Sequence, residues 1–325
     1  MSNYNLEITN LTKKFGKLTA LSDINLTVDK GEVFGYIGPN GAGKTTTIRV
    51  MLGILKATAG NAKVFGKDAW KDAVEIHRRI AYVPGDVNLW PNLTGGEVID
   101  LFVNLRGIHD KSLREKLIKD FDLDPTKKCR TYSKGNRQKV ALVAAFASDV
   151  DLYILDEPTS GLDPLMEQVF QHYVLDVKGK GKGVFLSSHI MSEVERLCDR
   201  VGIIREGDLV QVGTLDELRH LTRYAMTVTT ERPIDGLDTL EGVYNVHEEL
   251  HGLCFHVDVS KMGSVIDYMN KYGIKKLDSN PPTLEELFMQ HYNRAEGESR
   301  PGSHGHDRPS DDLNDSYNRA NEEGA

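Results

Sequence analysis

Short apolar runs, each bounded by polar residues, recur along the first two thirds of the chain. Three of them lie at residues 80–83, 152–155 and 184–186. They are apolar throughout rather than alternating, which is typical of parallel strands covered on both faces of a sheet. Segments with helical spacing of apolar residues separate them, at 96–105, 111–121 and 137–147. The succession of strands and helices predicts an α/β unit from residue 6 to about residue 219.

Two further apolar runs lie close together nearer the N-terminus. Residues 24–28 and 33–37 flank the segment Asp29-Lys30-Gly31-Glu32, which has the polar and glycine-containing composition of a turn. Two runs joined by so short a turn predict a hairpin.

The pattern changes near residue 221. Strand-like runs at 224–229, 243–247 and 253–259 precede a helical pattern at 262–272. A last helical segment, 283–292, begins with Thr283 and has Glu286 three residues later, as in a capping box. Beyond it the chain holds eight acidic residues and almost nothing apolar, a composition that predicts disorder. We therefore expect three parts: residues 5–220, a small α+β domain at 221–293, and a disordered acidic tail at 294–325.

A glycine-rich segment directly follows the run 33–37 and matches G-x-x-x-x-G-K-[ST] at every position. Its glycines permit a backbone path that a Cβ would obstruct, so that its amides and those of a helix at 45–52 can face a polyphosphate. A chance match in a chain of this length is expected about once in a hundred, and here a strand and a helix flank it. The nucleotide-binding residues predicted from the segment are Gly38, Pro39, Asn40, Gly41, Ala42, Gly43, Lys44, Thr45 and Thr46.

The P-loop pattern also assigns roles to two side chains. Lys44 would reach the β- and γ-phosphates, and the Thr45 hydroxyl would hold Mg²⁺. Further along, the run 152–155 ends in two carboxylates, Asp156 and Glu157. Because successive strand residues point to opposite sides, one carboxylate can bind Mg²⁺ through water while the other faces the γ-phosphate as a base.

Three more polar segments accompany these two. Residues 158–163 read Pro-Thr-Ser-Gly-Leu-Asp, residues 187–189 read Ser-Ser-His, and residues 132–138 read Tyr-Ser-Lys-Gly-Asn-Arg-Gln at the start of a helix. The exposed amides of that helix and the Ser133 hydroxyl form a second end able to bind phosphate.

In this order and spacing, the five motifs resemble those of the ATP-binding subunits of ABC transporters, over nearly all of residues 6–219. The resemblance implies a P-loop NTPase ABC cassette with a RecA-like core, an antiparallel β subdomain and a helical signature subdomain. It implies ATP and Mg²⁺ as cofactors, with Thr45 and Asp156 on the metal. It also assigns catalysis to Lys44, to Glu157 as the base, and to His189 as the switch histidine.

The resemblance assigns further residues to the nucleotide. Residues 132–136 occupy the signature position in the form YSKGN rather than LSGGQ, which implies contacts to ATP from Ser133, Gly135 and Asn136. Asp163 ends the D-loop, and Phe15 matches the aromatic residue that stacks on adenine. For Phe15, packing in the core is the alternative interpretation.

One position departs from the family pattern. The loop after residues 80–83 reads Pro84-Gly85-Asp86, where the family usually has glutamine after proline. Either Asp86 replaces this glutamine at Mg²⁺ one residue later, or the contact is missing; we expect Asp86 to replace it. In the same region, Trp90 either packs under its own loop or contacts a membrane partner.

The resemblance implies an ATPase that drives a separate membrane permease. One copy of each motif implies a second copy of the chain, or a similar subunit, since family members pair head to tail. The YSK-G-x-R-Q-K form, with Pro-Thr-Leu-Glu-Glu-Leu-Phe at 282–288, resembles subunits paired with ABC-2 type permeases, which mostly export drugs, antibiotics, lipids or polysaccharides. The alternative is a non-transport ABC ATPase of translation or repair, which would normally carry two cassettes or an inserted coiled coil. A nucleotide kinase or GTPase would lack the signature.

Composition narrows the partners and the compartment. The net charge is −8, and the basic residues are interspersed with acids, so we expect no nucleic-acid partner. Three widely spaced cysteines favour a reducing compartment. The longest apolar run, 140–147, is shorter than the roughly 20 residues of a spanning helix. We expect a cytoplasmic protein on the inner face of the cell membrane, attached through its permease.

Residues 247–251, His-Glu-Glu-Leu-His, match the zinc-protease pattern H-E-x-x-H. That chemistry needs a helix, which puts positions i and i+4 on one face. The surrounding pattern predicts two strands around a turn. In an extended segment the histidines would lie about 13 Å apart, too far for one metal unless the turn brought them together. We therefore do not expect zinc-dependent hydrolysis.

Overall fold

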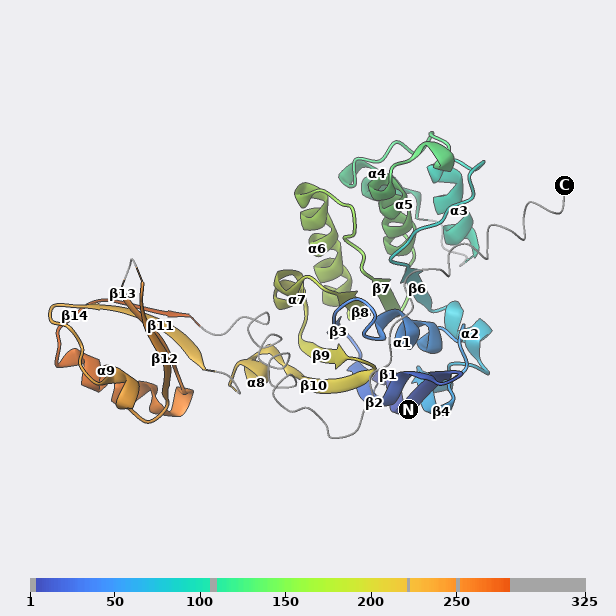
Figure 1. The fold of residues 1–325 in the computed structure, drawn as a ribbon. Coiled ribbons are helices and arrows are strands. Elements are labelled where there is room, and N and C mark those ends of the chain that lie inside the picture. The colour runs from blue at the N-terminus through green and yellow to red at the C-terminus, as the bar shows by residue number, and fades with distance from the viewer. Residues whose placement is uncertain (1–3, 106–109, 221–222, 250–251, 281–325) are drawn as a thin grey trace, which may run out of the picture. The chain divides into compact units, whose positions relative to one another are not determined.

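The computed structural model describes residues 4–105, 110–220, 223–249 and 252–280, and Figure 1 shows their elements. Within these ranges the strands are β1 (Tyr4–Phe15), β2 (Leu18–Asp29), β3 (Val33–Ile37), β4 (Ala59–Val64), β5 (Lys67–Asp68), β6 (Ile80–Val83), β7 (Leu152–Asp156), β8 (Gly183–Ser188), β9 (Arg200–Arg205), β10 (Asp208–Thr214), β11 (Tyr224–Thr230), β12 (Val243–Glu249), β13 (Gly252–Val257) and β14 (Ile274–Asn280). The helices are α1 (Lys44–Met51), α2 (Ala73–His77), α3 (Gly95–Leu105), α4 (Lys111–Asp120), α5 (Lys134–Phe146), α6 (Pro164–Gly179), α7 (Met191–Leu197), α8 (Leu215–His220) and α9 (Met262–Asn270).

A six-stranded sheet forms the centre of the first 220 residues, with strand order β10-β9-β3-β8-β7-β6. All neighbouring pairs are parallel except β10 with β9 at the edge. Every residue of β3, β7 and β8 is buried, because helices cover one face, and α1 and a second sheet cover the other. The predicted parallel strands at 80–83, 152–155 and 184–186 are confirmed.

Alternate residues of the central strands serve two separate cores. On β3, Val33 and Ile37 pack with α3, α5 and α6. Phe34 and Tyr36, on the opposite face, pack with α1 and with the apolar side chains of β1 and β2. The carboxyl ends of β3, β7 and β8 are thereby held at one edge of a rigid sheet, where parallel sheets carry their binding sites.

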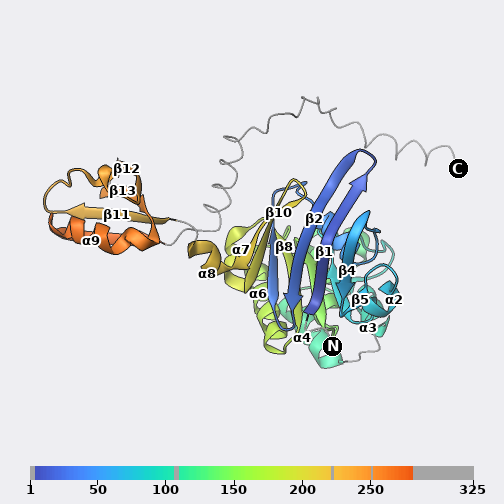
Figure 2. The same cartoon turned by 90° about the horizontal axis from the view of Figure 1, so that it is seen from below.

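A second sheet has the order β2-β1-β4-β5 and is antiparallel. Figure 2 shows β1 and β2 as a long hairpin beside β4. The predicted hairpin of residues 24–28 with 33–37 is therefore wrong, because β2 pairs with β1 while β3 lies between β9 and β8.

The turn between β2 and β3 connects the second sheet to the central sheet. Gly31 has a left-handed φ of 72°. The carboxylate of Glu32 accepts a hydrogen bond from the Asp29 amide at 2.6 Å and pairs with Arg200 at 3.2 Å. Glu32 thus links the turn to Arg200, the first residue of β9, with which β3 pairs.

The third sheet, β12-β13-β11-β14, is antiparallel and packs its apolar face on α9. The strands expected at 224–229, 243–247 and 253–259 and the helix at 262–272 are confirmed, with end shifts of up to two residues. The helix expected at 283–292 and the tail at 294–325 lie outside the described residues. No helix in the described part of the chain combines the length and apolar character needed to cross a bilayer.

Candidate nucleotide-binding site

The loop between β3 and α1 passes close to the backbone of neighbouring strands. A Cβ on Gly38 would lie 2.4 Å from the carbonyl oxygen of Ile204, so only glycine fits there. Gly43 has φ 112° and adjoins the Ala20 carbonyl of β2. The loop thus places the first turn of α1 at the edge of the sheet. The amides of this turn lack acceptors within the helix.

Lys44 is 5% exposed, and its ammonium is surrounded by oxygen atoms. It donates to the carbonyls of Gly38 and Pro39 at 2.6 and 3.2 Å. It also pairs with Glu157 Oε1 at 3.3 Å. The cation is therefore held inside the loop, at the point where the pattern requires it to meet phosphate.

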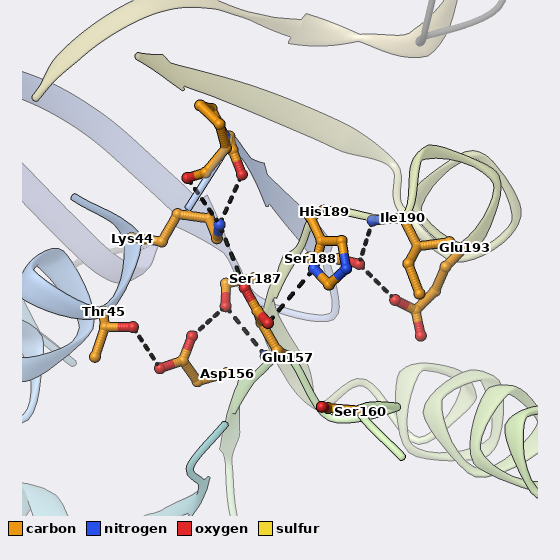
Figure 3. A network of polar contacts seen from close by, with 12 residues as sticks. Lys44, Thr45, Asp156, Glu157, Ser160, Ser187, Ser188, His189, Ile190 and Glu193 are labelled. Carbon is orange, nitrogen blue, oxygen red and sulfur yellow. Dashed lines mark hydrogen bonds and ion pairs between the residues drawn. The ribbon is translucent and has the colours of Figure 1, made fainter. Parts of the chain in front are cut away.

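Asp156 at the end of β7 joins three chain segments (Figure 3). Its Oδ2 accepts from the Thr45 hydroxyl at 2.9 Å, and its Oδ1 accepts from the Ser187 hydroxyl of β8. The carboxylate is 3% exposed, so these two hydroxyls replace water as its donors.

The Glu157 side chain points away from the Thr45 hydroxyl that Asp156 contacts, and toward Lys44 and His189. It has φ 46°, an unusual conformation for a residue other than glycine. Its amide donates to the Ser187 carbonyl at 3.0 Å, which anchors the turn. One carboxylate oxygen meets Lys44, and the other lies 3.4 Å from His189 Nδ1 (Figure 3). The predicted catalytic residues Lys44, Glu157 and His189 are thus in contact.

The signature segment and the D-loop lie against each other in the same chain. Ser133 is exposed, and its hydroxyl accepts from the Asn136 amide as the N-cap of α5. A Cβ on Gly135 would lie 2.4 Å from the carbonyl oxygen of Gly161, so the two backbones approach closely. Asp163 caps α6 by accepting from two amides. In the described residues none of these groups bonds to the P-loop, so one chain brings together only one half of the predicted site.

Phe15 lies at the end of β1 and is 46% exposed, with Lys13 Nζ 4.9 Å from its ring centroid. Packing in the core, the alternative interpretation, is therefore wrong. Phe15 pairs with Leu18, two residues before Ala20, whose carbonyl adjoins Gly43. An exposed ring close to the P-loop fits the proposed adenine platform.

The loop after β6 does not bring Asp86 to the predicted metal ligands. Asp86 is exposed and accepts from Asn88 Nδ2 at 3.5 Å. The preceding residue is closer to the carboxylates, since a Cβ on Gly85 would lie 3.3 Å from the Asp156 carbonyl. A metal contact by Asp86 remains a prediction and requires this loop to move.

Asp86→Ala tests that contact. If the carboxylate reaches Mg²⁺ during turnover, its loss will lower ATP hydrolysis about tenfold, as removal of a supporting metal contact does. The rate should be measured across a Mg²⁺ series, with Asn88→Ala as the control. Full hydrolysis by Asp86→Ala at every Mg²⁺ concentration would remove Asp86 from the metal site.

Two residues that support the site had no role assigned from the sequence. Ser187 bonds both the Asp156 carboxylate and the Glu157 amide. Glu193 of α7 is 4% exposed and accepts from the Ser188 hydroxyl at 2.7 Å, to one side of His189 (Figure 3). For Ser187 a signal was present: a polar residue ends a buried strand beside β7. For Glu193 we find none, because its burial depends on tertiary packing.

Burial raises the pKa of Glu193 to about 7, and the nearby charges of Glu167 and Glu157 add to the rise. Hydrogen bonds from Ser188 and Thr159 oppose it. Because the folded state holds this proton more tightly than the unfolded state, its stabilising effect is complete below about pH 4.5. It is lost as the pH rises through about 7.

In Glu193→Gln the side chain cannot ionise, so the variant should not lose this stability as the pH rises. Between pH 5 and pH 8, the free energy of unfolding of the variant should gain about 2 kcal/mol relative to the wild type. Urea unfolding at the two pH values measures the difference, with Glu195→Gln on the same helix as the control. Parallel pH dependence of Glu193→Gln and the wild type would contradict a buried acid with this pKa.

Comparison with known proteins identifies the class. The sequence model of the ABC transporter family matches residues 21–160. The bacitracin transport ATP-binding protein BcrA of Bacillus licheniformis is 34% identical over 294 residues, or 88% of this chain and 96% of that protein. The probable multidrug ABC transporter ATP-binding protein YbhF of Escherichia coli (strain K12) is 34% identical over 233 residues, or 70% of this chain and 39% of that protein.

Solved structures of ATP-binding cassettes have the same fold as this chain. An ATP-binding subunit of an ABC transporter, 34% identical, superimposes with a TM-score of 0.63 over 66% of this chain and 92% of that chain. A dimeric ATP-binding cassette bound to ADP and Pi shares the fold at 24% identity, with a TM-score of 0.59 over 65% of this chain and 98% of that chain.

The chain belongs to the ATP-binding subunits of ABC transporters. It is a P-loop ATPase of the transport type. The fold class and family that the motifs implied are both confirmed.

Proposed function

We propose that this subunit hydrolyses ATP with Mg²⁺ to energise a separate permease of the ABC-2 type that exports a drug or antibiotic. The contact of Glu157 with both Lys44 and His189 is the observation that carries the catalytic part. The similarity to the bacitracin transport and multidrug transporter subunits supports the class of cargo. The permease would hold the subunit at the inner face of the membrane.

The residues present fit Mg²⁺. Thr45 Oγ1 and Asp156 Oδ2 lie 2.9 Å apart, and oxygen is the ligand that Mg²⁺ prefers. Ser187 holds the other carboxylate oxygen and so orients Asp156. Thr45 and Asp156 would hold the ion, which when bound offsets the charge of the phosphates.

Phosphate binding and activation of the base are coupled through Lys44. Its ammonium now pairs with Glu157, and phosphate oxygens compete for the same cation. As Lys44 turns to phosphate, Glu157 is released to accept a proton from the attacking water. His189, 3.4 Å from Glu157, keeps the carboxylate in place and lies where it can meet the γ-phosphate.

The other half of the site comes from a second copy or a similar subunit. Ser133 lies exposed at the N-terminus of α5, a helix end suited to an anion. We place Ser133, Gly135 and Asn136 of one subunit over the ATP that the P-loop of the other subunit holds. Asp163, fixed as the cap of α6, lies in the D-loop against this segment.

A hollow beside the site is a docking place for the permease. It measures 260 Å³ and lies between the end of β6, α3 and α5. Its lining is mostly apolar and includes Tyr82, Pro84, Leu89, Phe102 and Ala141. Because Pro84 precedes the loop that adjoins Asp156, a helix of the permease seated here would respond to the state of the nucleotide.

Trp90 directly follows Leu89, which lines this hollow. Its ring centroid is 6.2 Å from that of Phe102, so it packs partly on α3, yet it is 52% exposed. Half-exposed aromatic side chains beside an apolar hollow are typical of partner sites. We therefore assign Trp90 to the contact with the permease.

Trp90→Ala should leave the ATPase rate of the isolated subunit within about twofold of the wild type, while loss of an interface anchor weakens the complex by about 2 kcal/mol or more. Co-purification with the permease and export in cells measure the effect. Trp70→Ala, which removes another half-exposed tryptophan, is the control. Normal assembly and export by Trp90→Ala would leave only the packing role.

The export function is tested in cells that lack the subunit. We expect increased sensitivity to compounds in a panel that includes bacitracin, restored by the wild-type chain but not by Glu157→Gln. Defects in translation or DNA repair with unchanged sensitivity to every compound would instead favour a non-transport ABC ATPase.

A further inference from the structure

We propose that the open face of the third sheet binds a zinc ion through His247, Glu249 and Cys254. These residues lie on β12 and β13, and their ligand atoms are all within 4.8 Å of one another. Imidazole nitrogen, carboxylate oxygen and cysteine sulfur are the three ligand types of protein zinc sites. Nothing in the nucleotide site or the proposed docking hollow uses these side chains.

The backbone is built to bring them together. His247 is directly opposite Cys254 in the β12–β13 ladder, and Glu249 follows two residues later on the same face. The register shifts by one residue between Tyr244 and His247, where Asn245 has φ 52°. This is a β-bulge, a feature that redirects side chains.

The bulge has a clear consequence for the two faces of the strand. Val243 and Val246 both pack on the core of this domain, although residues three apart in a regular strand face opposite sides. The extra residue therefore keeps both valines inside and turns His247 and Glu249 outward beside Cys254. Without it, Val246 would occupy the position opposite Cys254.

The ring of His247 is held as a metal ligand would be. Nδ1 lies 2.8 Å from the Asn245 carbonyl, which can only accept, so Nδ1 carries a proton. In the neutral ring, Nε2 then presents its lone pair to Glu249 Oε1 at 3.1 Å. His247 Nε2 and Glu249 Oε1 are therefore close enough to bind one cation together. A metal-binding histidine typically donates its other N–H to a carbonyl in this way.

Cys254 is accessible to a metal ion from the open face of the sheet. Cys129 and Cys198 are buried, whereas Cys254 is partly exposed. The Thr227 hydroxyl lies 3.3 Å from its Sγ and can donate to a thiolate. Tetrahedral zinc needs ligand atoms about 3.5 Å apart, a distance that small rotations of the exposed His247 and Glu249 side chains can reach.

This site differs from the H-E-x-x-H pattern in the same segment. His247 lies on a strand, as expected, and its partners are the second residue along and a residue of the next strand; His251 lies outside the described residues. Three protein ligands leave a fourth position open for water or a further group.

Titration of the full-length chain with Co²⁺, and then with Zn²⁺ in competition, tests the proposal. We expect one Co²⁺ per chain with a sulfur-to-cobalt charge-transfer band, lost on addition of Zn²⁺. His247→Ala and Glu249→Gln should each weaken Zn²⁺ binding at least about tenfold. Cys254→Ser should abolish the charge-transfer band. Glu248→Gln, which changes the neighbouring exposed carboxylate outside the cluster, is the matched control and should bind as the wild type does.

Two results of the metal titrations would overturn the zinc site. If the chain binds no Co²⁺, or binds it with a band that survives Cys254→Ser, the proposal is overturned. It is equally overturned if His247→Ala and Glu249→Gln bind Zn²⁺ as the wild type does, because His247 and Glu249 are then a simple ion pair. Circular dichroism of each variant verifies the fold, and the readout does not depend on ATP hydrolysis.

Discussion

Replacement of Glu157 by glutamine is expected to lower steady-state ATP hydrolysis by at least about 100-fold, the contribution typical of a general base. Glutamine keeps the size of the side chain but cannot take a proton from water. The Asp156–Thr45 contact does not involve Glu157, and removal of its charge frees Lys44 for phosphate. ATP binding should therefore persist or strengthen.

Phosphate release and binding of a fluorescent ATP analogue measure the two effects separately. Glu115→Gln, which changes an exposed acid on α4, is the control. A hydrolysis rate for Glu157→Gln within about twofold of the wild type would remove Glu157 as the base.

Lys44→Ala and Ser133→Ala are expected to fail in different ways. Loss of the buried Lys44 cation should weaken ATP binding by the single chain at least about tenfold, because charge-assisted contacts to phosphate are lost. Ser133→Ala should leave that binding nearly intact, since among the described residues the Ser133 hydroxyl bonds only the Asn136 amide. It should instead impair closure of the dimer and hydrolysis.

A mixture of the two variants tests the head-to-tail arrangement. A hybrid dimer holds one intact site, made of Lys44 from the Ser133→Ala chain and Ser133 from the Lys44→Ala chain. Mixing should therefore restore part of the ATPase rate that each variant lacks alone. Full activity of each variant alone, with no gain on mixing, would contradict a composite site.

The sequence predicted the elements that depend on local pattern. The strands at 80–83 and 152–156 and the loop around Lys44 were found because an unbroken apolar run or a fixed glycine spacing marks each of them. The failed hairpin shows the limit of local pattern. Neighbours in sequence enter different sheets because β3 pairs with β8 and β9, which lie far away in the chain. Glu32, just before β3, likewise contacts Arg200, 168 residues away.

The site was predicted to a similar extent. Lys44, Glu157 and His189 belong to motifs and are in contact in the structure, and Asp156 bonds Thr45. Their catalytic and metal-binding roles stay predictions. Ser187 and Glu193 support these residues through contacts set by packing, such as the bond between Ser187 and Asp156 across 31 residues of chain. The exposure of Asp86 and of Phe15 likewise depends on neighbours that local spacing does not reveal.

The mass of the Glu157→Gln chain in ATP tests the central claim most directly, because the structure brings together only one half of the site in each chain. Light scattering after gel filtration should give a monomer without nucleotide and, with ATP and Mg²⁺, a dimer that retains two ATP molecules. Ser133→Ala in the same background should lower the dimer fraction. A chain that binds ATP fully and stays monomeric at every concentration would contradict the account.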